Sequence, residues 1–189
     1  MCLESEFSEF SFLDDNFFQK IKLYKDLLNE FNAVHNLTNF KDINKEVKDS
    51  IRVLKFKDLN WAKNIIDIGS GAGFPAVFLA LILKANFYLF EPNAKKVSFL
   101  YNIKIKCDIK NIHIIKEKIQ DYKAPFIADI ITSRALMSVD NLIKISKNFF
   151  NEKSLFVLYK GSNLEKELSN FKEYEIIENG LRKYCFLQI

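Results

Sequence analysis

The segment NIIDIGSGAGFPAVFLALIL, from Asn64 to Leu83, contains three of the five glycines of this 189-residue chain. A short apolar run leads into glycines at alternate positions, Gly69, Gly71 and Gly73, and a second apolar run begins after Pro75. Proline favours the first turn of a helix, and glycine lets the backbone turn tightly and approach a ligand closely. The segment therefore predicts a strand, a loop and a helix, in which the loop is either a ligand site or a plain tight turn.

After about residue 60, the chain alternates short apolar runs with helix-like segments. The apolar runs, rich in Ile, Phe and Tyr, cover residues 63–69, 86–91, 111–116, 127–133 and 154–160. The helix-like segments cover residues 75–84, 93–106, a short piece near Ile119, and 138–148. Strands that alternate with helices favour a parallel sheet covered on both faces. Because YEIIEN and KYCFLQI at the end predict an antiparallel hairpin, we expect an α/β fold with a mostly parallel sheet over residues 61–189.

Residues 1–60 have a helical pattern instead. Apolar residues recur at spacings of three and four over about residues 14–34, which places on one stripe of a helix Phe17, Ile21, Tyr24, Leu28 and Phe31. A second helix is predicted over residues 43–56, with inward side chains at Ile43, Val47, Ile51 and Leu54. We expect residues 1–60 to form a helical extension that does not fold independently.

Composition excludes several classes of protein. Nearly half of the residues are apolar, no apolar run has the length of about 18 residues that a membrane span needs, and the N-terminus is acidic, unlike a signal peptide. We expect a soluble cytoplasmic protein. Cys2, Cys107 and Cys185 are scattered and odd in number, which favours free or buried thiols over disulfides or a zinc site. The formal charge of +4 permits a polyanionic partner without requiring one.

Two acids frame the glycine loop. Asp67 stands two residues before the first glycine, where a carboxylate can attract a cationic ligand, and Glu91 ends the second run, where it can accept both hydroxyls of a ribose. The spacing is GxGxG and not the GxGxxG that seats a pyrophosphate. The set suits S-adenosylmethionine, a nucleoside with a cationic amino-acid tail. A dinucleotide-binding oxidoreductase is the alternative class, and a solvated strand-end charge is the alternative for Glu91.

The segment DIGSGAGFP (residues 67–75) is similar to the Asp-x-Gly-x-Gly-x-Gly-x-Pro signature of the bacterial 16S ribosomal RNA guanine-N7 methyltransferases, the RsmG or glucose-inhibited division protein B family. Further blocks match in order: HNLTNFKD (35–42), KDSI (48–51), FEPNAKKVSFL (90–100), DIITSRAL (129–136) and LYKG (158–161). The Ser-Arg-Ala and Leu-Lys-Gly blocks are fairly specific to this family, whereas the glycine loop is not. One departure is Glu46, which stands where family members commonly have histidine.

The resemblance implies a Rossmann-like class I methyltransferase fold, S-adenosylmethionine as cofactor and 16S rRNA as partner. It implies that the methionine and ribose pocket is lined by Gly69, Ser70, Gly71, Gly73 and Phe74. The ribose would be held by Glu91, Pro92 and Asn93, and the adenine by Ile119 and Gln120. Arg134 would lie against both the cofactor and the target base.

Methylation of guanine N7 asks little of catalytic residues, because the N7 lone pair is nucleophilic without deprotonation. The transfer needs the base and the methyl group to be placed in line at about 3 Å in a pocket without water. It needs no general base, which suits a chain with only two histidines. His113 falls in an apolar run and is predicted to be a core residue. Cytosine C5 chemistry would need a cysteine beside the fourth run, and exocyclic-amine chemistry an Asn/Asp-Pro-Pro-aromatic loop where this chain reads TSRA.

Three polar residues are candidates for the catalytic side of the pocket. Arg134 is predicted to place the guanine, whose O6 and N7 edge invites a guanidinium, and an ion pair with Asp129 or another acid is the alternative. Lys160, at the end of the fifth run, is predicted to contact a phosphate and to matter more for RNA than for cofactor binding; a surface lysine is its alternative. Asn36, with Asn39, is predicted to flank the pocket.

A cationic stripe follows the second helix at spacings of three and four: Lys41, Lys45, Lys48, Arg52 and Lys55. Asp42, Glu46 and Asp49 run beside it, which favours a self-neutralised, solvated face. The functional alternative is that the stripe grips RNA phosphates beside a target base that has left its stack.

The sequence leaves other functions open. They are methylation of a substrate other than RNA, and a non-enzymatic RNA-binding protein with a degenerate cofactor site. We expect no metal, no membrane partner and a monomer, although the sequence carries no signal for the oligomeric state.

Overall fold

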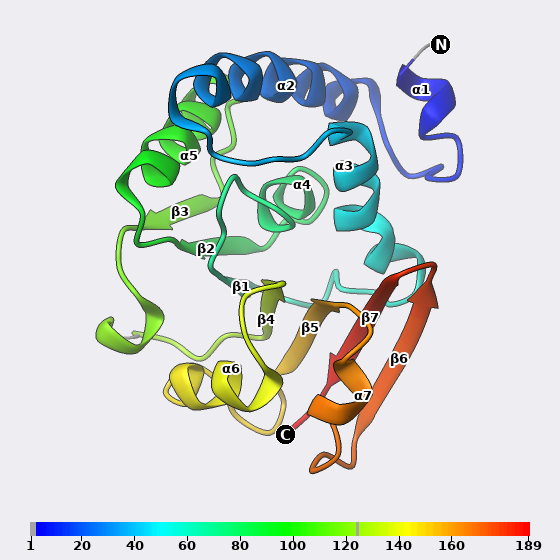
Figure 1. Ribbon diagram of the computed structural model, residues 1–189, viewed down its shortest axis with the longest axis vertical. Helices are drawn as coiled ribbons and strands as arrows, with labels where there is room; N and C mark the ends of the chain where they lie inside the picture. Colours follow the sequence, from blue (N-terminus) through cyan, green and yellow to red (C-terminus); the bar gives the residue numbers. More distant parts are fainter. Residues whose placement is uncertain (1–2, 124) are drawn as a thin grey trace.

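The computed structural model describes residues 3–123 and 125–189, and its centre is a seven-stranded sheet of order β3-β2-β1-β4-β5-β7-β6 (Figure 1). Five strands are parallel: β1 (Asn64–Ile68), β2 (Asn86–Phe90), β3 (Ile112–Ile115), β4 (Ile130–Arg134) and β5 (Leu155–Lys160). The last two, β6 (Tyr174–Asn179) and β7 (Arg182–Leu187), form an antiparallel hairpin whose β7 pairs with β5. The predicted α/β fold and terminal hairpin are confirmed.

Helices cover both faces of this sheet, as Figure 1 shows. On one face lie α2 (Asp15–His35), α3 (Ile43–Ile51) with the 3-10 turn η1 (Arg52–Lys55), α4 (Ala76–Ala80) and α5 (Ala94–Lys106). On the other lie α6 (Val139–Ser146) and α7 (Leu164–Glu167), and η2 (Ile119–Asp121) follows β3. The predicted helices are present, although α4 is shorter than the expected 75–84. The single-turn helices α1 (Leu3–Glu6) and α7 are not predicted, because four residues are too few to show a helical period.

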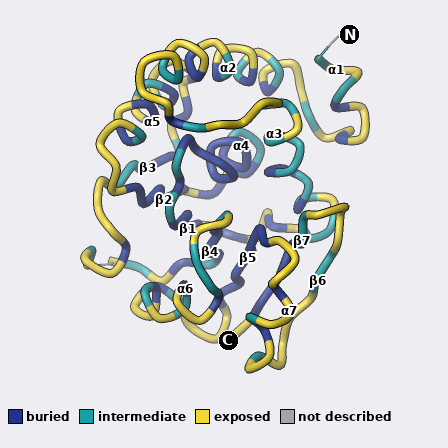
Figure 2. The backbone as a smooth tube through the Cα atoms, in the orientation of Figure 1, coloured by how far each residue is buried: buried dark blue, intermediate teal, exposed yellow. Residues whose placement is uncertain are grey.

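Each face of the sheet has its own apolar core. Side chains alternate across a strand, so Ile65 of β1 packs with α4 and α5 while Ile66 packs with α6 on the opposite face. Figure 2 shows the central strands buried and the outer surface of α2 exposed. The core is therefore divided by the sheet into two layers, as expected for a parallel sheet.

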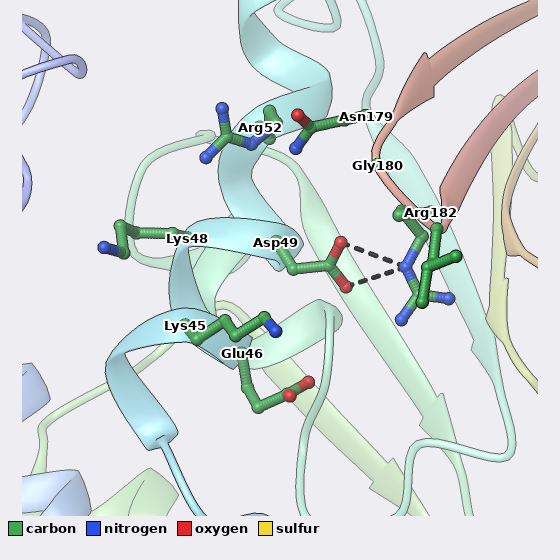
Figure 3. Close-up of a pocket in the computed structure, with 9 residues that line it drawn as sticks. Lys45, Glu46, Lys48, Asp49, Arg52, Asn179, Gly180 and Arg182 are labelled. Atoms are coloured by element: carbon green, nitrogen blue, oxygen red, sulfur yellow. Dashed lines mark hydrogen bonds and ion pairs between the residues drawn. The ribbon is translucent and has the colours of Figure 1, made fainter.

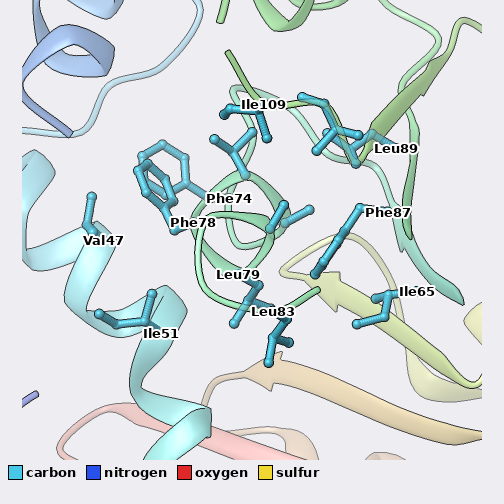
Figure 4. Packing of buried hydrophobic residues seen from close by; sticks show 14 of the residues in the cluster. Val47, Ile51, Ile65, Phe74, Phe78, Leu79, Leu83, Phe87, Leu89 and Ile109 are labelled. Carbon is cyan, nitrogen blue, oxygen red and sulfur yellow. The ribbon is translucent and has the colours of Figure 1, made fainter. Parts of the chain in front are cut away.

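The N-terminal helices complete the first of these cores. Tyr24 of α2 packs against Phe78 of α4 and Phe99 of α5, with ring centroids 4.8 and 5.7 Å apart. Val47 and Ile51 of α3 belong to the same cluster, and Figure 4 shows them facing the helix α4. The described N-terminal helices thus contribute to the core of the sheet domain instead of forming one of their own.

His113 corrects one expectation. The prediction that it is a core residue is wrong, because β3 is an edge strand and this position points to solvent, where the imidazole stacks on Tyr88 at 4.9 Å. Cys107 and Cys185 are buried free thiols, as expected, whereas Cys2 lies outside the described residues. Among the described helices, none is both long and apolar enough to cross a membrane.

Candidate functional site

The loops at the carboxyl ends of β1, β2 and β4 meet around the glycine segment, and two cavities open there. The first, the apolar cavity, has a volume of about 280 Å³ and walls that include Gly69, Phe90, Pro92, Ile119, Gln120, Leu136 and Met137. The second, the polar cavity, has a volume of about 360 Å³ and walls that include Thr38, Phe40, Gly69, Ser70, Gly71, Phe74, Lys96, Arg134 and Arg182. Because Gly69 lines both, the two cavities lie on either side of the same loop.

The glycines leave the room that these cavities need. A Cβ added to Gly69 would lie 2.9 Å from Cδ2 of Leu136, a residue in the wall of the apolar cavity. A Cβ added to Gly71, whose φ is +58°, would meet only the Gly69 carbonyl at 3.9 Å. A side chain at position 71 would therefore stand in the open polar cavity, in a backbone conformation that L residues rarely adopt. The open space at Gly71 would let a ligand bind directly against the backbone of the loop.

Glu91 joins the end of β2 to the glycine loop. Its carboxylate accepts hydrogen bonds from the backbone N–H of Gly71 and of Asn93, both at 2.8 Å. Asn93 in turn caps the N-terminus of α5 by accepting from the N–H groups of Lys95 and Lys96. Glu91 is 5% exposed and does not belong to the walls of either cavity. In the structure, the carboxylate of Glu91 therefore fixes the position of the glycine loop.

Asp67 is buried beneath the loop, at 1% exposure. One carboxylate oxygen accepts a hydrogen bond from Oγ1 of Thr132 at 2.6 Å, while Oδ2 has no hydrogen-bond partner among the described residues. Burial raises the pKa of this carboxyl to about 7, because the loss of hydration outweighs the hydrogen bonds with Ser70 and Thr132 that favour its charged form. Asp67 is thus a buried acid with one unsatisfied oxygen, next to a glycine loop.

Arg134, the last residue of β4, forms part of the wall of the polar cavity. Its guanidinium carbon lies 5.2 Å from the ring centroid of Phe40 and 5.6 Å from that of Phe74. Its side chain is 8% exposed, and burial together with the charge of Arg182 lowers the pKa of the guanidinium to about 10. Arg134 therefore remains a cation at neutral pH, packed against two aromatic rings that contact each other.

The acids that pair with Arg134 come from α3. Glu46 forms an ion pair with Nη2 of Arg134, and Oδ2 of Asp49 lies 3.4 Å from Nη1. The alternative of an ion pair with Asp129 or another acid is therefore confirmed for another acid, whereas Asp129 is wrong as the partner, because it accepts from the backbone N–H groups of Lys63 and Asn64. Glu46, the departure from the family pattern, thus supplies a carboxylate to the arginine of the Ser-Arg-Ala block.

Asp49 and Arg182 belong to the same network, and the sequence gives them no role. Nε of Arg182 lies 3.0 Å from both oxygens of Asp49, which also accepts from the Tyr184 hydroxyl at 2.8 Å. Tyr159 of β5 donates to the carbonyl of Ser50 at 2.6 Å, so α3 is fixed to the sheet. The sequence gives one hint of this network: two acids, Glu46 and Asp49, lie three residues apart among the basic residues of α3.

Asn36 does not line either cavity. It is the exposed C-cap residue of α2, in the left-handed conformation. Its neighbours do line the polar cavity, because the side chain of Asn32 pairs with both the N–H and the C=O of Thr38 at 2.9 Å and so folds residues 37–40 over the loop. The predicted role belongs to this segment, through Leu37, Thr38 and Phe40, rather than to the Asn36 side chain.

Lys160 is buried at 7% exposure, so the surface-lysine alternative is wrong. Its ammonium contacts the carbonyl of Met137 and lies 2.7 Å from Oε2 of Glu167, which also accepts from the N–H of Val139 at 2.9 Å. These contacts hold the segment 135–139, which includes Ala135 at a φ of +50°. Lys160 and Glu167 thus act on the cavity through the segment that carries Leu136 and Met137.

The cationic stripe on α3 is not neutralised as expected. Its neighbouring acids Glu46 and Asp49 pair with arginines of the site, and Asp42 caps the helix, accepting from the N–H of Lys45. Instead Glu9, from the N-terminal segment, pairs with Arg52 at 2.7 Å and with Lys55 at 3.4 Å. The prediction of a face neutralised by its own helix is therefore wrong.

Among the described residues that line either cavity there is no histidine. Of the two histidines, His35 ends α2 on the surface and His113 lies on the edge strand, while Glu46 and Asp49 are engaged in ion pairs. Within residues 3–123 and 125–189, no group of three His, Cys, Asp or Glu side chains could hold a metal ion. The arrangement suits a reaction that needs placement rather than proton abstraction.

The strand order, the glycine loop after β1 and the acid after β2 define the fold of the S-adenosylmethionine-dependent methyltransferases. Solved structures agree. A methyltransferase from Aquifex aeolicus has a TM-score of 0.61 at 17% identity, covering 85% of this chain and 96% of that one. A ribosomal protein L11 methylase from Lactobacillus delbrueckii has a TM-score of 0.61 at 11% identity, covering 79% and 80%.

Within that class, the chain belongs to the family described as rRNA small subunit methyltransferase G, whose model matches residues 18–187. A protein named ribosomal RNA small subunit methyltransferase G from Campylobacter jejuni is 55% identical over 186 residues, covering 96% of this chain and 99% of that protein. One of the same name from Helicobacter bizzozeronii is 41% identical, covering 89% of this chain and 96% of that protein.

Proposed function

We propose that this protein transfers the methyl group of S-adenosylmethionine to N7 of a guanine in 16S rRNA, and that it acts as a monomer in the cytoplasm. Family membership supports an rRNA methyltransferase. The observation that carries the mechanism is the pair of cavities that share Gly69. The apolar cavity suits an adenine, and the polar cavity suits the methionine end of the cofactor together with a target base.

The residues present fit this cofactor. The two oxygens of Glu91 each accept one backbone N–H and keep a further lone pair for a ribose hydroxyl. The unsatisfied oxygen of Asp67 lies beneath the loop that would receive a cationic amino-acid tail. S-adenosylmethionine supplies a methyl group made electrophilic by a positively charged sulfur. Leu136 and Met137 shield the apolar cavity, and Gly71 lets the ligand approach the backbone.

Glu91 also counts against a dinucleotide. In a pyrophosphate-binding loop the free N–H groups face the anion. Here the N–H of Gly71 donates to the carboxylate of Glu91, so a pyrophosphate at this place would face a negative charge. The oxidoreductase alternative therefore has neither the spacing nor the electrostatics in its favour.

The chemistry requires the chain to place the guanine and to exclude water. N7 attacks through a lone pair in the ring plane, and the leaving thioether is neutral, so neither base nor acid is needed. Arg134, packed against Phe40 and Phe74, forms a cationic wall of the polar cavity. From there a guanidinium N–H can donate to guanine O6 and fix the base while N7 stays free for the methyl group.

The direct test uses small subunits and naked 16S rRNA from cells that lack this gene. The purified protein and labelled S-adenosylmethionine should transfer label to one guanine, located by primer extension across N7-cleaved RNA. Isothermal titration should show binding of S-adenosylmethionine and none of NAD. Label found in protein or small molecules but not in RNA would overturn the substrate, and NAD binding would overturn the cofactor.

A further inference from the structure

A further concave region lies between α3 and the turn that joins β6 to β7. We call it the α3–turn groove; its volume is about 520 Å³, and its walls come from residues 45–52 and from the turn residues 179–182 (Figure 3). In Figure 3 the side chain of Asp49 points from α3 across to Arg182. The groove is therefore closed on one side by the same ion pair that supports the polar cavity.

The walls of this groove are cationic. Lys45, Lys48, Arg52 and Arg182 face two acids, and both acids are occupied by arginines. Arg52 is neutralised by Glu9. Within the described part of the chain no carboxylate lies within 4.0 Å of the ammonium of Lys45 or Lys48. Two lysines one helical turn apart thus lack a carboxylate partner, although the ammonium of Lys48 donates to the backbone carbonyl of Glu6 at 3.5 Å and lies 5.7 Å from the ring centroid of Phe7. Positive charges at this spacing suit phosphate groups.

The groove continues into the polar cavity. Arg182 lines both, because it starts β7 beside the end of β5, the strand that separates β7 from β4. Its Nε is used by Asp49, and its Nη1 donates to the carbonyl of Lys160 at 3.4 Å. An anionic strand lying in the groove would therefore contact the guanidinium of Arg182 at the boundary between the groove and the polar cavity.

The rim of the groove carries an apolar side chain in solvent. Leu181 is 95% exposed, at the two-residue turn between the paired residues Asn179 and Arg182. The antiparallel hairpin holds it out with no partner in the protein's own core. Proteins that unstack bases insert apolar side chains of this kind between them. A target guanine has to leave its stack to reach a cofactor pocket, and the gap it leaves is apolar.

We propose that the α3–turn groove binds the RNA strand that flanks the target guanine. Lys45, Lys48 and Arg182 hold its phosphates, and Leu181 packs against the base next to the extruded guanine. This site rests on the proposed function and names the part of the substrate that the cavities themselves do not hold: one or two flanking nucleotides, recognised through backbone charge and an exposed base face.

The phosphate contacts are tested by salt dependence. The double variant Lys45→Gln/Lys48→Gln should lower the slope of log Kd against log salt for unmethylated 16S rRNA by about 1.4, at about 0.7 per lost contact with single-stranded RNA. The affinity for S-adenosylmethionine should not change. The matched control is Lys144→Gln/Lys147→Gln, two exposed lysines at the same spacing at the end of α6. An unchanged slope, or an equal change in the control, would overturn the phosphate assignment.

The place of Leu181 is tested by cross-linking. With Leu181 replaced by p-benzoylphenylalanine, irradiation on the unmethylated small subunit should give cross-links within about two nucleotides of the guanine that the wild-type protein methylates. Ile105 of α5, which is 73% exposed, is the control position and should give none there. Cross-links from position 181 to a distant part of the RNA, or none above the control, would place the strand elsewhere.

These experiments distinguish an error in the groove assignment from an error in the proposed function. If wild-type protein methylates a guanine but the cross-links lie elsewhere, the groove assignment falls and the function stands. If position 181 cross-links to one RNA segment and the lysine variant loses salt dependence while no N7 methylation occurs, the groove is an RNA site and the proposed reaction falls.

Discussion

Asp67 is the residue whose environment has the clearest measurable consequence. Its pKa is about 7 in the folded protein, against 3.8 for the ordinary carboxyl, so the folded state binds a proton that the unfolded state has lost between these two values. The free energy of unfolding should therefore fall as the pH rises from about 4 to about 7 and then level off. A difference of about three pKa units corresponds to roughly 4 kcal/mol as an upper bound.

The variant Asp67→Asn isolates this contribution. The difference between wild-type and variant stability, measured by urea titration across this pH range, should show the slope and the plateau. Because a cationic ligand favours the ionised acid, wild-type affinity for S-adenosylmethionine should also rise through pH 7, and that of the variant should not. A stability difference that stays flat from pH 4 to 8 would show that Asp67 ionises normally.

Arg134 combines a structural and a proposed catalytic role, and variants can separate them. Arg134→Ala leaves the largely buried Glu46 without its ion-pair partner, whereas Asp49 keeps Arg182, so we expect a loss of about 3 kcal/mol in stability and a loss of turnover. The double variant Arg134→Ala/Glu46→Gln also removes the unpaired negative charge of Glu46. It should recover much of the stability but not the turnover. Recovery of turnover along with stability would mean that Arg134 only supports the fold.

At the level of elements, the segment between β4 and α6 decides how the two cavities are shaped. Ala135, which is held at a positive φ, lines the polar cavity, and Leu136 and Met137 line the apolar cavity. Such a conformation persists only where the surroundings fix it, and here Lys160 and Glu167 supply the contacts.

The variant Glu167→Ala should therefore weaken cofactor binding. Without its carboxylate the N–H of Val139 and the ammonium of Lys160 lose their acceptor, and Leu136 and Met137 lose a fixed position. We expect the Kd for S-adenosylmethionine to rise about tenfold, which corresponds to roughly 1.4 kcal/mol, while rRNA affinity stays unchanged. The control is Glu165→Ala on the exposed side of the same helix. A larger effect on RNA than on cofactor would restore the phosphate role that the sequence suggests for Lys160.

At the scale of the whole molecule, one core joins the N-terminal helices to the sheet. Phe17, Ile21 and Tyr24 of α2 are buried in the same cluster as α4 and α5, and the hydroxyl of Tyr24 donates to the carbonyl of Ala72 at 2.6 Å. The helical extension is thus tied directly to the glycine loop. A site built on that loop depends on both parts of the chain.

A chain that starts at Trp61 should therefore not fold cooperatively. Removal of residues 1–60 would expose the apolar faces of α4 and α5, including Phe78 and Phe99, which are fully buried in the whole protein. We expect no sharp thermal transition by circular dichroism and binding of hydrophobic dyes, in contrast to the full chain. A single sharp transition in the shortened chain would show that residues 61–189 form an independent domain.

The sequence predicts the elements well and the side-chain partners poorly. The alternation of apolar runs and helices is a local pattern, so it identifies β1 to β7 and the glycine loop that carries Gly69, while the position of Gln120 in the cavity wall agrees with what the family resemblance implies. His113 is misplaced because an apolar run does not tell an edge strand from a central one. For Lys160 the sequence does not show its partners, Met137 and Glu167, because they come from other parts of the chain; its phosphate contact stays a prediction.

The sequence by itself thus determines the order of strands and helices, the glycine loop and the acids that frame it, because these follow from contacts between near neighbours in the chain. Only the tertiary structure decides what the charges do. Arg134 meets Glu46 across 88 residues and Arg182 meets Asp49 across 133, and no local pattern encodes such pairs. Folding brings them together because burying a charge is costly unless an opposite charge is brought to it.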